Sequence, residues 1–381
     1  MKRWVTKIET ILPFVIIECF LVYGVCSTVC ETAWPASGQY WNYFLYILYA
    51  IVLIKVLLQR NSRMEWLLVL SLTGLAELSR ITTQTNTVLW FVCGVVIARN
   101  INPDTILKAD FVTRFILGLC LIILPIAGLY PNQADVKIGG RFRDSFGWAH
   151  PNEMGLFFLM FCIIWLYFRH DKWSWKDTAG MLPLVVFLDY FANSRTSEIC
   201  IIGLLVLEGI IFFLRKRRTP VWRRVELEAV ITSFFLVAGC LGTLVLITIT
   251  DKGSRWFSYL PQTVSERLKL AHNYWAAEGF SVAGQIFDNA KYTYLDILYP
   301  YLALNYGIII LLLFLILNGI AIWRAYKTQD EKMLLILLVF LIYSLLEHEH
   351  FKILSGFYPV LLGHALWSEI KDQRSGKNTT G

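Results

Sequence analysis

The sequence has little charge. Only 17% of its 381 residues are Asp, Glu, Lys or Arg, and 56% are hydrophobic, whereas soluble domains have about 25% charged and about 45–50% apolar residues. The apolar excess lies in blocks of roughly 18–22 residues, the length that crosses about 30 Å of hydrocarbon. Such blocks exclude a soluble enzyme with one membrane tail. They also exclude a transmembrane β-barrel, whose strands alternate apolar and polar residues. The pattern predicts an all-α polytopic membrane protein.

The sequence also lacks the motifs of metal and redox sites. No CxxC pair occurs, and no cysteine is spaced from a histidine as in a zinc site. All eight cysteines lie in or at the end of apolar blocks, where a thiol packs as a small apolar side chain. We therefore predict no metal and no cofactor.

The net charge of +7 does not require an acidic partner. The basic residues are spread along the chain, and the densest run, Arg215–Arg218, directly follows an apolar block. Anionic lipid of the inner membrane leaflet attracts such a run. The predicted partners are therefore membrane lipids and not nucleic acid.

The apolar blocks predict about ten to twelve helices, because a backbone in lipid must satisfy its own hydrogen bonds. The third, fourth and eleventh blocks are short or contain polar residues, which leaves the number open. The predicted spans are 9–30, 41–59, 64–79, 81–98, 111–130, 152–168, 179–194, 197–214, 229–250, 297–322, 333–347 and 352–368.

Lys and Arg orient these helices. With the N-terminus in the cytoplasm, most of the 35 Lys and Arg residues fall in cytoplasmic segments, as the positive-inside rule requires. Both termini are then cytoplasmic, and two long loops, 131–151 and 251–296, face outward. We predict a single membrane domain over 1–381, with N-terminal helices in 1–130 and both loops in 131–370. Within the longer loop we expect a helix over Glu266–Glu278 that lies on the outer membrane face.

Arginines at the outer face are the informative charges, because an arginine near lipid is costly to desolvate and marks a partner or a substrate path. Arg141 and Arg143 lie in the first outer loop, which runs into a helix start at Pro151 with Ala149 or His150 at the cap. The free N–H groups of a helix start and two guanidinium groups suit an anion such as diphosphate. A loop held by an Arg143–Asp144 salt bridge is the alternative.

Arg195 lies in a short polar turn, Asn193–Glu198, between two apolar spans. Asn193 or Ser194 can cap the helix that follows. The arginine is then either a second contact for an anion or a side chain that reaches from the membrane boundary to the lipid headgroups. Both interpretations place it at the outer face.

Three further side chains of the outer segments can exchange protons. His272 lies in the longer loop and titrates near neutral pH, with a solvated surface histidine as the alternative. Asp296 lies where that loop enters a helix, so a helix cap is its alternative. Glu347 opens the turn Glu347–His350, where a carboxylate can abstract a proton or pair with an arginine. The H-x-H spacing of this turn lacks the i, i+4 histidine pair of a zinc helix.

The ordered set of motifs resembles the bacterial superfamily of Wzy-type polysaccharide polymerases and O-antigen ligases. The resemblance covers residues 130–370, and the chain before them is similar only in being apolar and multi-spanning. The residues that carry the resemblance are Arg141-Phe142-Arg143, Phe146-Gly147, His150-Pro151-Asn152-Glu153, Gly155, Ser194-Arg195-Thr196, Leu295-Asp296, Tyr299, Tyr306-Gly307 and Glu347.

This resemblance implies an integral membrane glycosyltransferase of the C-type (GT-C) architecture with about twelve helices. Such enzymes join undecaprenyl-diphosphate-linked oligosaccharide units into capsular polysaccharide, exopolysaccharide or O-antigen. They act at the outer face of the bacterial cytoplasmic membrane without metal, and the lipid diphosphate leaves. A flippase and a chain-length regulator of the same pathway are implied as partners.

The resemblance also implies roles for single residues. The diphosphate-binding residues would be Arg141, Arg143 and Arg195. The catalytic residues would be His272, Glu347 and Asp296. The residues in contact with the sugar substrate would be His150, Asn152, Tyr274 and Trp275.

Two alternatives stay open. His272-Asn273 is similar to the histidine motif of the ligases, whereas Asp296 and Tyr299 are similar to polymerases of capsule clusters. Arginines in an outward cavity also suit a transporter or flippase of lipid-linked or anionic substrates. Many transporters contain inverted repeats and helices broken by Gly or Pro, and we detect no internal repeat in the sequence.

Overall fold

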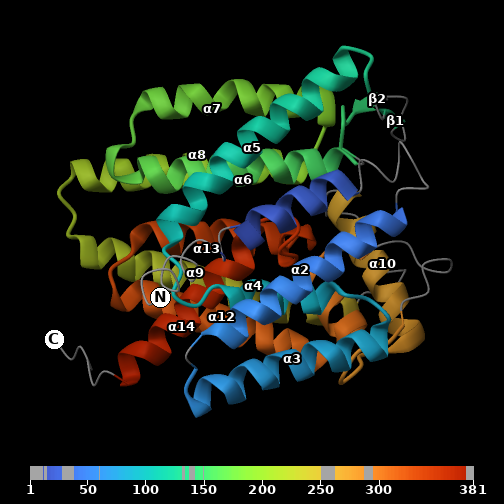
Figure 1. Cartoon of the computed structure of the whole chain (residues 1–381). Coiled ribbons are helices and arrows are strands. Elements are labelled where there is room, and N and C mark those ends of the chain that lie inside the picture. Colours follow the sequence, from blue (N-terminus) through green and yellow to red (C-terminus); the bar gives the residue numbers. More distant parts are fainter. Residues whose placement is uncertain are drawn as a thin grey trace, which may run out of the picture. The chain divides into compact units, whose positions relative to one another are not determined.

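The computed structural model describes the chain as helices joined by short segments (Figure 1). The described residues are 12, 15–27, 38–59, 61–130, 134–136, 142–148, 150–249, 262–286 and 295–374. The elements from α2 to α8 are α2 (Gly38–Leu58), α3 (Arg63–Thr83), α4 (Thr87–Ile97), α5 (Pro103–Ile126), β1 (Ala134–Val136), β2 (Phe142–Asp144), α6 (Pro151–Arg169), η2 (His170–Lys172), α7 (Trp175–Phe187), η3 (Leu188–Ala192) and α8 (Arg195–Lys216). The later elements are α9 (Val221–Ile249), α10 (Gln262–Glu278), α11 (Leu298–Tyr301), η5 (Leu302–Tyr306), α12 (Ile308–Lys327), α13 (Glu331–Ser344), η6 (Glu349–Phe351) and α14 (Tyr358–Arg374).

Six helices of the described chain are long and apolar enough to cross a membrane. Two shorter apolar helices, Val15–Ser27 and Thr87–Ile97, accompany them. The predicted all-α class with several membrane helices is therefore supported at this level. The six helices are Tyr40–Leu58, Pro103–Ile126, Pro151–Lys172, Arg195–Lys216, Val221–Ile249 and Ile308–Lys327.

Helix α9 shows the kind of surface that lipid favours. Its exposed large side chains recur every three or four residues and form one apolar stripe. Water penalises a continuous apolar stripe of this kind, whereas the hydrocarbon of a membrane does not. The exposed side chains are Val230, Phe234, Val237, Leu241 and Val245. The buried stripe contains Thr232, Leu236, Cys240, Thr243 and Ile247.

The chain divides into two compact units, each made of segments that lie far apart in the sequence. The first unit comprises Met1–Arg60, Cys93–Thr219 and Lys352–Ser368. The second unit comprises Asn61–Val92, Pro220–Phe351 and Glu369–Gly381. The predicted parts 1–130 and 131–370 do not coincide with these units.

In the first unit, α6 packs against both α5 and α8, and α7 lies beside α8 (Figure 1). The contact between α6 and α8 depends on Gly155, where an added Cβ would lie 2.2 Å from Ser194 Oγ and 2.7 Å from Ser197 Oγ. Small residues of this kind let two helices approach closely. The sequence therefore places glycine and serine where the two backbones meet.

A short antiparallel hairpin lies in the loop predicted over 131–151. Strand β1 pairs with β2 in the register Ala134 to Asp144 and Val136 to Phe142. Each strand has only three residues, too few for the alternation that signals a strand in sequence. The hairpin was therefore not predicted.

In the second unit, α9 packs against α12 and α13, and α10 packs against α9. The helix predicted over Glu266–Glu278 is confirmed and begins four residues earlier, at Gln262. Of the predicted long loop, residues 262–286 and 295–296 are described.

The helix predicted over 297–322 is wrong as a single element. It is divided at Gly307 into α11 with the π-helical turn η5 and the separate helix α12. Gly307 has φ +89°, a conformation that other residues rarely adopt. The N–H groups of Ile308 and Ile309, the first residues of α12, donate to the carbonyls of Ser281 and Val282 at 3.0 and 3.2 Å. The segment after α10 therefore supplies the acceptors that a continuous helix would have supplied itself.

We expect Gly307→Ala to destabilise the chain by about 2–3 kcal/mol. An added Cβ would lie 2.4 Å from the Val282 carbonyl oxygen, and φ would stay positive. Gly319→Ala is the control, because nothing lies within 4 Å of an added Cβ there, and an interior helical alanine gains up to about 1 kcal/mol over glycine. Thermal unfolding of both variants in detergent measures the difference. Equal stability of the two variants would contradict the structural role of Gly307.

Candidate functional site

Arg267 on α10 gathers two of the predicted catalytic carboxylates in the second unit. Its Nε lies 2.9 Å from Asp296 Oδ2, and its Nη2 lies 2.6 Å from Glu347 Oε1. Its Nη1 donates to the Leu346 carbonyl at 2.6 Å. The guanidinium group therefore holds two acids from segments 51 positions apart, the junction before α11 and the turn after α13, at one point.

Glu347 is the more deeply buried of these two acids. Only 4% of the residue is exposed, and burial raises the pKa of its carboxyl to about 7, with Arg267 opposing that rise and Asp296 adding to it. A carboxylate with a pKa near neutral pH can both take up and release a proton under working conditions. The position therefore suits general acid–base chemistry.

Aromatic and histidine side chains continue the polar contacts around Asp296. His348 Nδ1 lies 3.3 Å from the Asp296 carbonyl oxygen, and its ring centroid lies 3.9 Å from that of Tyr301. The hydroxyls of Tyr301 and Tyr306 are 2.9 Å apart, and Thr85 Oγ1 donates to Tyr306 at 3.3 Å. The turn η5 thus contributes to the same polar network as Asp296.

His350, the other histidine of the H-x-H turn, has a different role. Its Nε2 lies 3.0 Å from Ser344 Oγ, and the residue is fully buried. Burial, with the nearby His348, lowers the pKa of its imidazole to about 3. His350 therefore stays neutral and fixes the end of α13.

His272 is held by contacts other than those of Glu347 and Asp296. Its Nδ1 lies 2.7 Å from the Ile247 carbonyl oxygen. A carbonyl can only accept, so Nδ1 carries a proton, and in the neutral ring the lone pair is on Nε2. The His272 ring lies beside that of Trp275, with centroids 5.8 Å apart.

The two aromatic residues predicted to contact sugar belong to a hydrophobic cluster. Tyr274 is 1% exposed and lies in this cluster with Ile247, Leu268 and Leu304. Trp275 is partly buried and packs against the same cluster. Both rings thus stabilise the contact of α10 with α9, and Trp275 alone keeps some exposed surface.

Arg143 of the first unit binds backbone carbonyls. Its Nε donates to the Ala192 carbonyl at 2.7 Å, and Nη2 donates to Asn152 Oδ1 at 2.8 Å and to the Asn193 carbonyl at 3.4 Å. The carbonyls are those at the end of η3, which lack partners within their own helix. The structure therefore brings Arg143 and Asn152 together, and the guanidinium group joins β2 to the η3–α8 turn.

Two of the remaining predicted residues of the first unit, His150 and Arg195, lie at helix starts. His150, one of the two caps that the sequence predicts, caps α6, because its Nδ1 accepts the Asn152 N–H at 3.1 Å. Arg195 is the first residue of α8 and is exposed. Arg141 lies outside the described residues.

We expect Arg143→Lys to destabilise the chain by about 2–3 kcal/mol, because a lysine cannot serve two carbonyls and an amide oxygen at once. Arg195→Lys is the matched control, since Arg195 is exposed and surface substitutions usually change stability by less than about 0.5 kcal/mol. Urea unfolding in detergent compares the two variants. If Arg143→Lys is as stable as the natural chain, the contacts of Arg143 with the two carbonyls do not stabilise the fold.

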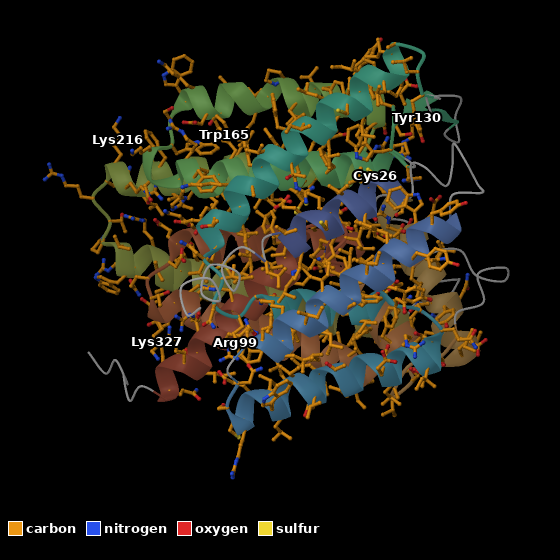
Figure 2. The ribbon with its side chains drawn as sticks, in the orientation of Figure 1. Cys26, Arg99, Tyr130, Trp165, Lys216 and Lys327 are labelled. Atoms are coloured by element: carbon orange, nitrogen blue, oxygen red, sulfur yellow. The ribbon has the colours of Figure 1, made fainter. Side chains whose placement is uncertain are left out.

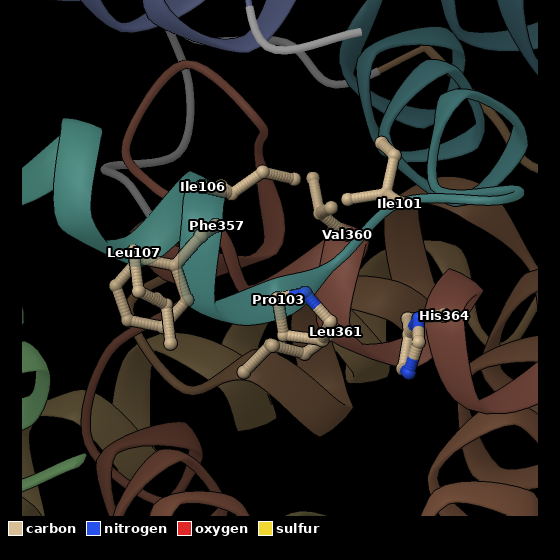
Figure 3. Close-up of a pocket in the computed structure, with 8 residues that line it drawn as sticks. All are labelled: Ile101, Pro103, Ile106, Leu107, Phe357, Val360, Leu361 and His364. Atoms are coloured by element: carbon tan, nitrogen blue, oxygen red, sulfur yellow. The ribbon is translucent and has the colours of Figure 1, made fainter. Parts of the chain in front are cut away.

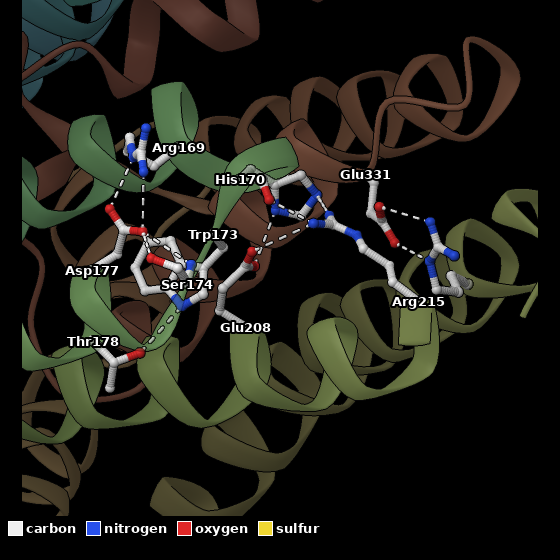
Figure 4. A network of polar contacts seen from close by, with 10 residues as sticks. Arg169, His170, Trp173, Ser174, Asp177, Thr178, Glu208, Arg215 and Glu331 are labelled. Atoms are coloured by element: carbon white, nitrogen blue, oxygen red, sulfur yellow. Dashed lines mark hydrogen bonds and ion pairs between the residues drawn. The ribbon is translucent and has the colours of Figure 1, made fainter. Parts of the chain in front are cut away.

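A second polar network lies at the C-terminal ends of α6 and α8 (Figure 4). His170 and Glu208 are fully buried, with Nδ1 and Oε2 3.0 Å apart. Arg215 donates to the His170 carbonyl at 2.5 Å and also contacts the His170 ring. Arg215 belongs to the basic run predicted to orient the membrane helices, so one residue of that run also joins α8 to the end of α6. Lys216 follows it at the end of α8 (Figure 2).

Each unit also contains an ion pair that joins two helices. In the first unit, Asp177 near the start of α7 pairs with Arg169 at 2.9 Å. In the second unit, Arg224 pairs with Glu331 at 2.6 Å and joins α9 to α13. Neither pair includes a predicted site residue.

One apolar pocket of the first unit lies between the start of α5 and α14 (Figure 3). Its lining contains none of the predicted site residues. The residues that line it are Ile101, Pro103, Ile106, Leu107, Phe357, Val360, Leu361 and His364. Among the described residues, no group of three or more His, Cys, Asp or Glu could hold a metal ion.

Sequence reasoning missed Arg267, and it considered His348 only as part of the H-x-H spacing. Arg267 lies in the amphipathic helix predicted on the outer face, but its spacing from Asp296 and Glu347 carries no local signal. Comparisons with protein-family models, with curated proteins and with solved structures found no match.

Proposed function

We propose that this chain is a membrane glycosyltransferase that polymerises undecaprenyl-diphosphate-linked oligosaccharide units at the outer face of the bacterial cytoplasmic membrane. In this proposal the chain has about twelve spans, a C-type (GT-C) architecture and two cytoplasmic termini. A flippase supplies the lipid-linked units, and a chain-length regulator acts on the product. The proposal rests on the sequence resemblance and on one structural observation.

That observation is the pair of carboxylates on Arg267, of which Glu347 is buried. Glu347 has a pKa of about 7, so it can accept the proton of an acceptor hydroxyl. The hydroxyl oxygen then attacks the anomeric carbon of the donor sugar, and the bond from that carbon to the diphosphate oxygen breaks. The electron pair leaves with the lipid diphosphate, and the anomeric configuration inverts. Arg267 and Asp296 act as positioning residues, because they hold Glu347 at this point.

The diphosphate needs positive charge, because the leaving group gains negative charge as the bond breaks. Arg195 supports this role, since its guanidinium group is exposed at the first residue of a helix. Arg141 and Arg143 keep the roles that the resemblance implies. Because Arg143 already binds two carbonyls and Asn152, its contribution is to fix the turn that carries Arg195. Trp275 offers a partly exposed ring for stacking on sugar.

Reconstitution tests the function directly. The purified chain is placed in lipid vesicles with a synthetic undecaprenyl-diphosphate repeat unit, and the products are separated by size. A ladder of longer glycans supports the polymerase. Movement of the intact substrate across the vesicle membrane without new glycosidic bonds would contradict it and support a transporter.

We expect Arg195→Lys to raise the KM for the lipid-linked donor about tenfold and to leave the fold intact. Lysine keeps the charge but loses the paired N–H donors that match a phosphate group, and one charge-assisted hydrogen bond contributes about 1.5–3 kcal/mol. Steady-state rates over a range of donor concentrations measure the effect. An unchanged KM would remove Arg195 from diphosphate binding.

A ligase is the second candidate, because His272 presents the lone pair of Nε2, and its sequence resembles the ligase histidine motif. In that case His272 deprotonates a different acceptor, and only one transfer occurs. His272→Gln would then abolish the reaction and Glu347→Gln would not. The polymerase proposal expects the reverse order of effects.

A further inference from the structure

An ion pair lies in the middle of an apolar helix of the first unit. Arg114 Nε lies 2.7 Å from Asp110 Oδ2, and both side chains are 1% exposed. Arg114 is the twelfth of the 24 residues of α5, so it lies about 16 Å along the helix from either end. A charged pair at this depth of a membrane helix is costly unless it serves a function.

A second carboxylate faces this pair. Glu18 on the helix Val15–Ser27 lies near enough to interact electrostatically with both Asp110 and Arg114. Both carboxylate oxygens of Glu18 are buried. The cluster therefore contains two carboxyl groups and one guanidinium group, all within the first unit.

In the part of the chain that the structure describes, Arg114 is the cation that interacts with both acids. Arg114 Nη2 donates to the Ser355 carbonyl at 3.0 Å, and its guanidinium group lies 5.1 Å from the Phe157 ring centroid. Other ionisable groups of the packed elements include Cys19 beside Glu18, Lys108, which lies over the Phe168 ring, and Asp104, which accepts from Tyr167. Helix α2, which contacts the helix of Glu18 through Tyr49 and Phe20, carries Lys55, and that lysine donates to the Ile97 carbonyl. On α6 the charged residues are Glu153 and Arg169, at its two ends, and in 352–357 the charged residue is Lys352.

Space for the guanidinium group is built into the fold. An added Cβ at Gly356 would lie 3.2 Å from Arg114 Nη2 and 3.1 Å from the Met160 methyl group. An added Cβ at Gly24 would lie 2.5 Å from the Leu354 carbonyl oxygen, so the helix of Glu18 packs directly on the segment that binds Arg114. The helix Val15–Ser27, α5 and the segment before α14 thus enclose the cluster.

We propose that Glu18, Asp110 and Arg114 form a proton-binding site in the membrane interior that holds one proton, shared by the two carboxyl groups. With both acids ionised the cluster would carry one uncompensated negative charge in an apolar environment, and one proton makes it neutral. A sodium ion would need several further oxygen ligands, and the described residues gather no third acid here. The site uses none of the residues assigned to glycosyl transfer, so it does not depend on that function.

The charge count gives a different result for each variant. Glu18→Gln leaves the neutral Asp110–Arg114 pair, and Asp110→Asn leaves Glu18 with Arg114, so neither variant needs a proton. Arg114→Met leaves two acids without a cation, and both should be protonated. Infrared spectroscopy detects a protonated carboxyl group by its carbonyl stretching band, which shifts in D2O.

The experiment uses the full chain in lipid vesicles at about pH 8, where Glu347, with its pKa of about 7, is mostly ionised. Relative to the natural chain, the band should lose the intensity of one carboxyl in Glu18→Gln and in Asp110→Asn, and it should gain the intensity of one carboxyl in Arg114→Met. Glu77→Gln is the control, because that acid pairs with Arg80 on the exposed face of α3, and it should leave the band unchanged.

Three outcomes would overturn the proposal. The natural chain could show no band at this pH, or Glu18→Gln could keep the full band. A band that appears only when sodium is replaced by choline would show that a sodium ion occupies the site. If Arg114→Met fails to fold, Glu18→Gln still decides the question, because it retains the ion pair that joins α5 to Ser355.

Discussion

Replacing Glu347 by Gln lowers the rate of polymer formation by about 10²–10⁴-fold, the range that a general base contributes. Glutamine has nearly the same shape and can keep a hydrogen bond to Arg267, but it cannot accept a proton. The fold should survive, because the amide removes a buried negative charge. Initial rates of ladder formation from the reconstituted chain measure the effect.

The natural chain should also show a pH dependence with a definite sign. The ionised carboxylate is the active form of a base, and burial raises the pKa of Glu347 to about 7. The rate should therefore rise as the pH rises through about 7 and level off above it. If Glu347 had the ordinary pKa of a glutamate, the rate would level off at a pH more than one unit lower.

Glu266→Gln is the matched control for Glu347→Gln, since Glu266 is an exposed carboxylate next to Arg267 on α10. It should change the rate less than twofold. If both variants keep the natural rate, Glu347 is not the base. If Glu347→Gln fails to insert in the membrane, Glu347→Asp tests the same point, because it keeps the titrating group and displaces it by one methylene.

Replacing Arg267 by Gln has the second largest expected effect. Removing one partner of a buried ion pair costs about 3–5 kcal/mol, and here one cation serves two acids at 2.9 and 2.6 Å. Without Arg267, the charge that opposes the raised pKa of Glu347 is lost, whereas burial and Asp296 still raise it. The chain should be less stable, and the rate profile should move to higher pH.

Two measurements separate positioning from mere stability. The pH midpoint of the rate should increase in Arg267→Gln, which a loss of folded protein alone would not cause. The double variant Arg267→Gln with Glu347→Gln should recover part of the lost stability, because no buried acid then lacks its cation. Lys269→Gln, an exposed neighbour on α10, is the control, and a pH midpoint equal in Arg267→Gln and Lys269→Gln would reject the positioning role.

Some features of the site could be predicted because they depend on local chemistry. The cap of His150 before Pro151 follows from which side chains accept a helical N–H, and α10 follows from its helical pattern. Glu347 and Asp296 could be named because acids beside apolar spans are rare. Their common partner could not be named, because Arg267 reaches them only when α10 packs on α9.

Arg143 shows the opposite case. As an arginine of an outer loop, it was predicted to bind diphosphate or Asp144. In the structure, the guanidinium group of Arg143 donates hydrogen bonds to two backbone carbonyls and to Asn152. Whether an arginine meets a ligand or the end of a helix depends on which carbonyls lie near it, and those carbonyls come from a segment about 50 residues away.

The sequence by itself determined that this chain is a set of apolar helices, because in lipid each helix satisfies its own backbone and its length must match the hydrocarbon. Those requirements act over one span at a time and are visible in the order of residues. Only the tertiary structure decided where the helix after Asp296 breaks, which cation holds Glu347, and that Glu18 faces Asp110 and Arg114. These features depend on contacts between residues far apart in sequence, where burial and charge act across space.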